Sequence, residues 1–72
     1  MNTDSPKNQT NLALAALTAC IVQALDEQQA GVRSKFEASL EKAYYSLRDG
    51  KLADTECLET LRWTQDILKV LA

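Results

Sequence analysis

Apolar and polar residues alternate with the period of an α-helix in three stretches of the chain. These stretches cover about residues 12–29, 34–48 and 54–72, and the only two glycines, Gly31 and Gly50, fall between them. β-branched residues are sparse, whereas alanine, leucine, glutamate, lysine and glutamine, which favour helices, abound. The pattern therefore predicts an all-α fold, a bundle of three helices.

The first eleven residues differ from the rest of the chain, because they are polar and contain the only proline. We expect residues 1–11 to form a flexible N-terminal arm and residues 12–72 to form a single three-helix domain. A helix start at Ser5-Pro6 is an alternative, since proline suits the first position of a helix. The short turn after Gly50 makes the second and third helices an antiparallel hairpin.

Local signals predict where the helices begin and end. Gly31 follows the first stretch and is typical of a left-handed C-terminal cap. Ser34 and Glu37 have the spacing of a capping box, in which each side chain accepts a hydrogen bond from a free backbone N–H of the other residue. Asp49-Gly50 is a usual helix stop, and the carboxylate of Asp54 can cap the third helix.

The second and third helices each have one apolar face when their residues are placed about 100° apart. In the second helix the predicted core stripe consists of Val32, Phe36, Leu40, Ala43 and Leu47. In the third helix it consists of Cys57, Leu61, Thr64, Ile67, Leu68 and Leu71. The opposite face of the third helix carries charges of alternating sign, which is typical of a helix face in water.

The first helix is apolar almost all round, because only Asn11, Thr18 and Gln23 interrupt the apolar residues up to Leu25. A helix of this kind has to be covered on more than one side. We therefore expect it to be central and to pair with a second copy of the chain, since so small a domain has little stability of its own. Its alanine-rich side permits close approach, so the predicted homodimer interface is Leu12, Ala15, Ala16, Ala19 and Val22.

Composition narrows the function classes. The chain of 72 residues is 46% hydrophobic and 25% charged, as in ordinary globular proteins. It contains no histidine, which removes histidine-assisted nucleophiles and histidine-ligated metals. Neither a glycine-rich phosphate loop nor converging carboxylates can be recognised in the pattern. We therefore expect no enzyme activity, no cofactor and no metal site.

The two cysteines, Cys20 and Cys57, fall on stripes that we expect to be buried. Two free thiols in a reducing compartment are the favoured interpretation, which places the protein in the cytoplasm. Leu17-Thr18-Ala19-Cys20 also resembles the bacterial lipoprotein signal. That resemblance implies cleavage before Cys20, loss of residues 1–19 and attachment of lipid to the thiol.

Three observations favour a buried helix over a lipoprotein leader or a membrane span. The start of the chain lacks the excess of positive charge that a leader has, and the apolar pattern continues through Cys20 to Leu25. Residues 12–25 are also too short for a membrane span, which needs about 20 residues. We expect no span.

Contacts with another protein are predicted on the second helix. Tyr45 lies opposite the core stripe, with Glu41 one turn before it and Arg48 close by. Trp63, at the border of the third helix's stripe, is a possible flanking anchor, since tyrosine and tryptophan often carry interface energy. The predicted partner-binding residues are Glu41, Tyr45, Arg48 and Trp63.

The sequence therefore predicts a small non-enzymatic protein-protein interaction or regulatory module that acts as a helical homodimer. A small helical nucleic-acid-binding regulator is a further alternative, because the middle of the chain is its most basic part. The net charge of −2 weighs against it. So does the scatter of the basic residues over different helix faces: Arg33, Lys35, Lys42, Arg48 and Lys51.

Overall fold

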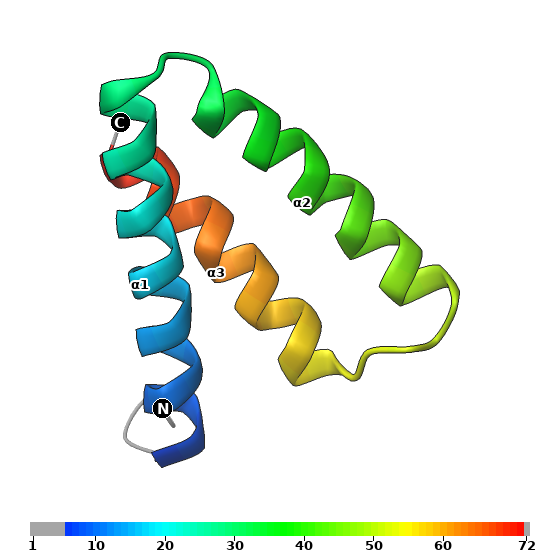
Figure 1. Ribbon diagram of the computed structural model, residues 1–72. Coiled ribbons are helices and arrows are strands. Elements are labelled where there is room, and N and C mark those ends of the chain that lie inside the picture. The colour runs from blue at the N-terminus through cyan, green and yellow to red at the C-terminus, as the bar shows by residue number, and fades with distance from the viewer. Residues whose placement is uncertain (1–5, 72) are drawn as a thin grey trace.

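The computed structural model describes residues 6–71, with side chains from residue 8 onward. Over this range the chain forms three helices, α1 (Pro6–Gln28), α2 (Val32–Asp49) and α3 (Thr55–Leu71), joined by short turns. The predicted all-α class is confirmed. As expected, α2 and α3 run in opposite directions, and α1 crosses the C-terminal part of α3 (Figure 1).

The molecule is thin. Its Cα atoms extend 35 × 29 × 13 Å. A helix places its Cα atoms about 2.3 Å from its axis, and packed helices lie about 8–10 Å apart. The shortest dimension therefore has room for two stacked helices at most, and every helix keeps a broad face toward solvent. Figure 1 looks onto the wide face of this arrangement.

The core lies mainly between α1 and α3. Ala19, Val22 and Leu68 form its buried centre, and Phe36 and Ile67 pack against it. The small side chains on α1 let the two helix backbones come close, so that Leu68 is completely enclosed. Thr64 is also buried, and its hydroxyl donates to the carbonyl oxygen of Thr60 at 3.0 Å, so its side chain is not left unsatisfied.

The predicted stripes of α2 and α3 are largely confirmed. On α2, Leu40 is buried, Val32, Phe36 and Leu47 are half-buried, and Ala43 is exposed. On α3, Thr64 and Leu68 are buried and Leu61 and Ile67 are half-buried. Cys57 and Leu71, at the two ends of the α3 stripe, are exposed.

The start of α1 differs from the prediction. The helix begins at Pro6 rather than near Leu12, so residues 6–11 belong to the helix and not to an arm. Proline at the first helical position lacks only an N–H that would have no partner in the helix, so it does not oppose this start. The other part of the predicted arm, residues 1–5, lies outside the described residues.

The turn between α1 and α2 is closed by a side chain that the sequence pattern did not indicate. The carboxylate of Asp26 accepts hydrogen bonds from the backbone N–H groups of Gly31 at 3.1 Å and Arg33 at 3.0 Å. Gly31 has the predicted left-handed conformation, with φ 100°. The capping box of Ser34 and Glu37 is wrong, since α2 already begins at Val32.

At the second turn the helix boundary is close to the expected one. α2 ends at Asp49, but Gly50 is right-handed (φ −80°) and the left-handed residue is Lys51 (φ 56°). Asp54 caps α3 as predicted, because its carboxylate accepts a hydrogen bond from the N–H of Cys57 at 2.9 Å.

Candidate interaction surfaces

The outer face of α1, defined by Leu14, Leu17, Ile21 and Leu25, is an apolar surface in contact with solvent. These four side chains are 53%, 61%, 60% and 51% exposed, respectively. They recur at intervals of three and four residues, so they follow one another along the helix. No charged residue occurs between positions 8 and 25 of the chain. The hydroxyl of Thr18, on the same side, donates to the carbonyl oxygen of Leu14 at 2.8 Å.

Most of the residues predicted for a homodimer interface are covered within the chain itself. Ala15, Ala19 and Val22 are 1%, 0% and 6% exposed, because helices of the same chain already cover them. Leu12 (39% exposed) and the half-buried Ala16 lie at the edge of this covered face. The alanines do permit a close helix approach, as expected, but they use it for α3. The surface left open is therefore the leucine-bearing outer face of α1.

A second surface is the tyrosine-arginine cluster, formed by Tyr44, Tyr45 and Arg48 of α2 with Arg62 of α3. The tyrosine rings meet edge to face, with centroids 5.3 Å apart. The guanidinium carbon of Arg48 lies 4.7 Å from the Tyr45 centroid and 5.9 Å from that of Tyr44. The guanidinium carbon of Arg62 lies 4.7 Å from the Tyr44 centroid. These distances are those of cation-π contacts.

Two of the predicted contact residues, Tyr45 and Arg48, thus lie together on an exposed surface, with Tyr45 42% exposed. Arg48 also pairs with Asp49, with 3.1 Å between Nε and Oδ1. The half-buried Trp63 has no ring contact with either tyrosine in the part of the chain that the structure describes.

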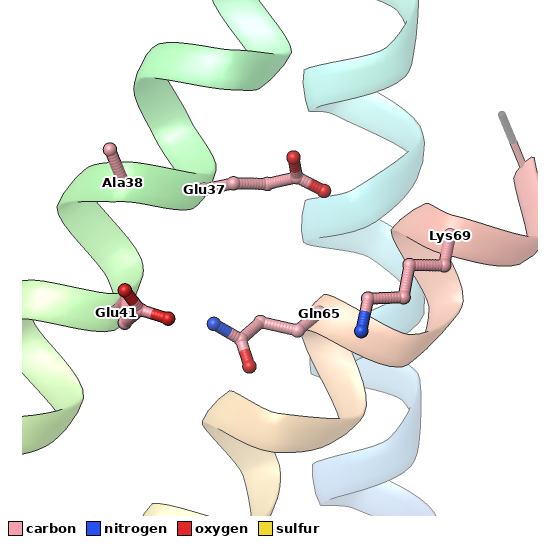
Figure 2. A pocket seen from close by; sticks show the side chains of 5 residues that line it. All are labelled: Glu37, Ala38, Glu41, Gln65 and Lys69. Carbon is pink, nitrogen blue, oxygen red and sulfur yellow. The ribbon is translucent and has the colours of Figure 1, made fainter.

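Glu41 lines an open polar pocket between α2 and α3 (Figure 2). Its volume is about 290 Å³, and the residues that line it are Glu37, Ala38, Glu41, Gln65 and Lys69. The Glu41 carboxylate and the Gln65 amide point toward each other across the gap (Figure 2). Glu41 precedes Tyr44 and Tyr45 by one turn of α2, but none of the residues of the tyrosine-arginine cluster lines this pocket.

The sequence pattern does not indicate that α3 contributes Arg62 to the tyrosine-arginine cluster. Arg62 belongs to the charged face of the third helix, as its position predicts, but its contact with Tyr44 joins two helices. The pattern along one helix cannot indicate such a pair. The only hint is the antiparallel hairpin, which brings the middle of α3 beside the second half of α2.

The prediction that both cysteines are buried is wrong. Cys20 and Cys57 are free and exposed. Cys57 lines a hollow of about 330 Å³ with Asn11, Asp54, Glu56, Thr60 and Leu61, between the N-terminal parts of α1 and α3. Cys20 lies in the middle of α1, so a cleavage before it would remove Ala15 and Ala19 from the buried part of that helix.

Two kinds of site are missing from residues 6–71. No group of three or more histidine, cysteine, aspartate or glutamate side chains in this range is placed to hold a metal ion. None of the described helices combines the length and the apolar character that crossing a bilayer requires. Comparison of the chain with protein-family models, curated proteins and solved structures gives no match.

Proposed function

We propose that this protein is a non-enzymatic protein-binding module that acts as a homodimer, paired through the outer face of α1. The observation that carries the proposal is the exposure of Leu14, Leu17, Ile21 and Leu25, each more than half in solvent, on one continuous helix face. A contiguous apolar surface of this kind typically marks a contact with another protein.

A second copy of the chain is the occupant that the surface supports best. In a two-fold dimer the same surface meets itself, so any charge in its centre would face its own copy. The outer face of α1 has no charged residue that could create such a conflict. Thr18 brings no free hydroxyl proton to the contact, because its donor is already used within the helix.

The expected strength is moderate. Burying a leucine or isoleucine completely contributes about 1.5–3 kcal/mol, so burying the exposed halves of eight such side chains contributes on the order of 10 kcal/mol. Association itself costs about 4–15 kcal/mol. We therefore expect a reversible dimer whose population depends on concentration.

The two exposed free thiols fit a reducing compartment, which supports a location in the cytoplasm.

Sedimentation velocity over about 10 µM to about 1 mM tests the proposal. We expect the unmodified chain to shift from monomer to dimer over this range, and Leu17→Glu to remain a monomer because two carboxylates would meet in an apolar contact. Leu52→Glu is the matched control. Leu52 is 78% exposed and belongs to the turn between α2 and α3. This turn lies away from α1 (Figure 1).

The control should dimerise like the unmodified chain. A chain that stays monomeric at every concentration would refute the proposed assembly. Equal loss of the dimer in both variants would move the contact away from the outer face of α1. Circular dichroism of the three proteins verifies that each remains helical.

A further inference from the structure

We infer that the tyrosine-arginine cluster is a docking site for an acidic segment of a partner protein, held by the guanidinium groups of Arg48 and Arg62. The inference rests on the proposed function only in that the chain binds proteins. It does not depend on the dimer, because the cluster lies on α2 and α3 and the outer face of α1 is a separate surface.

The two guanidinium groups are close enough to be used together. Their central carbons lie 5.9 Å and 4.7 Å from the same Tyr44 centroid, so they are at most about 11 Å apart. Glutamates four residues apart on a helix have Cβ atoms about 5–6 Å apart, and their side chains can spread to this distance. A helical segment with two such acids therefore matches the pair.

Both groups keep donors for a ligand. Arg48 uses Nε for Asp49, which leaves the two terminal nitrogens of its guanidinium. Arg62 has no carboxylate within 4 Å among the residues that the structure describes. The N–H groups of a guanidinium lie in one plane and can form two parallel bonds to a carboxylate.

The tyrosines reduce the cost of binding. A free arginine side chain has many rotamers, and ordering it opposes association. Here each guanidinium already lies 4.7 Å from a ring centroid, and the rings hold each other at 5.3 Å. The half-buried Tyr44 anchors both arginines to the body of the protein, so the ligand meets a prearranged pair.

The surrounding charges favour a short acidic segment over a nucleic acid. Four exposed acids lie on the flanks: Glu41, Asp49, Glu59 and Asp66. A phosphate backbone needs a continuous series of basic contacts, and here it would run from the two arginines onto carboxylates. A protein segment with two acids and neutral neighbours brings fewer negative charges beside these carboxylates, so the repulsion is smaller.

Fluorescence anisotropy with the full-length chain tests the inference at low salt. The probe is a labelled alanine-rich helical peptide with two glutamates four residues apart, and its twin carries glutamine at both positions. We expect the glutamate peptide to bind and its twin to bind about tenfold more weakly or not at all, since carboxylates strengthen the bonds to arginine. Equal binding of the two peptides, or no binding of either, would overturn the inference.

Variants locate the site. Arg62→Gln should weaken binding of the glutamate peptide about tenfold. Lys42→Gln removes the same charge from an exposed position of α2 outside the cluster and should change the affinity less than about twofold. Equal losses in both variants would reduce the effect to net charge and contradict a defined site.

Two further measurements distinguish the docking site from the dimer contact and from a nucleic-acid site. Leu17→Glu should retain peptide binding, so that failure of the dimer and failure of the docking site are distinguishable. A labelled DNA duplex should bind more weakly than the glutamate peptide under the same conditions. Tighter binding of the duplex, with the same loss in Arg62→Gln, would assign the cluster to nucleic acid and refute an acidic protein segment.

Discussion

The two faces of α1 are both apolar, yet one is buried within the chain and the other is exposed to solvent. The inner face carries Ala15 and Ala19, which are almost completely buried against the rest of the chain. The outer face carries the larger Leu17 and Ile21, which are 61% and 60% exposed. Hydrophobicity alone would place the leucines inside. Burial follows fit instead, because a helix can approach closely only where its side chains are small.

The consequence is a fold with a thin core and a large unused apolar surface. Among the described residues, Leu68 is the large side chain that is enclosed completely. Its pocket exists because Ala19 and Val22 face it with little bulk. Stability should therefore depend strongly on a few residues of the inner face, whereas the outer face is free to serve association.

The largest effect is expected where the inner face meets α3. Leu68→Ala leaves a cavity between α1 and α3 and should lower the free energy of unfolding by about 2–5 kcal/mol. The same change on the outer face, Leu17→Ala, should alter it by less than about 0.5 kcal/mol when the protein is diluted to the monomer. Urea denaturation followed by circular dichroism measures both.

A chain as small as this can unfold after the loss of one core leucine, so a milder change is needed as well. Leu68→Met nearly conserves the volume and should cost less than about 1.5 kcal/mol. Similar losses for Leu68→Ala and Leu17→Ala would mean that the two faces of α1 are not as different as their exposure indicates.

The next largest effect on stability is expected when an alanine of α1 is enlarged, and it should again differ between a buried and an exposed position. Ala19→Leu forces a large side chain into the contact with the core and should destabilise the monomer by about 1–3 kcal/mol. Ala24→Leu adds the same atoms to an exposed position of α1 and should leave the unfolding free energy within about 0.5 kcal/mol. Thermal unfolding of the two variants, compared at equal low concentration, measures both changes in stability. A neutral Ala19→Leu would contradict the close packing of α1 on α3.

Much of the fold is accessible from the sequence because the signals are local. The helical period, the turn at Gly31 and the cap at Asp54 each involve residues that are close together in the sequence. The pattern assigns Leu40 and Leu68 to the core because each lies within a single apolar stripe, and both are buried. On such amphipathic helices, only one arrangement removes the stripe from water.

The features of the fold that the sequence pattern does not predict depend on contacts between different helices. On α1 the apolar residues surround the helix, so the pattern cannot decide whether Ala19 or Leu17 faces the core. The contact between Arg62 and Tyr44 and the cap that Asp26 supplies to α2 both join residues of different helices. The exposure of Cys57 likewise depends on how α1 crosses α3, which leaves a hollow beside this residue. None of these has a signature in residue spacing along one helix.

The smallest of the three expected stability effects concerns the last turn of α1, where Asp26 lies toward the inner side and Glu27 is exposed. Asp26→Ala removes the acceptor for the N–H groups of Gly31 and Arg33 and should cost about 1 kcal/mol, as for other helix caps. Glu27→Ala, one position along the same turn, removes the same charge and should change stability by less than about 0.5 kcal/mol.

Amide hydrogen exchange, measured by NMR, separates a local from a general effect of Asp26→Ala. The N–H groups of Gly31 and Arg33 should exchange faster than in the unmodified chain, because they lose their partner while the middle of α1 keeps its helical bonds. Asp26→Asn keeps an acceptor oxygen in place and should restore most of the protection. If exchange at Gly31 and Arg33 is unchanged in Asp26→Ala, the carboxylate does not close the turn. α2 would then be held by its apolar contacts, among them those of Phe36, which packs against the buried centre of the core.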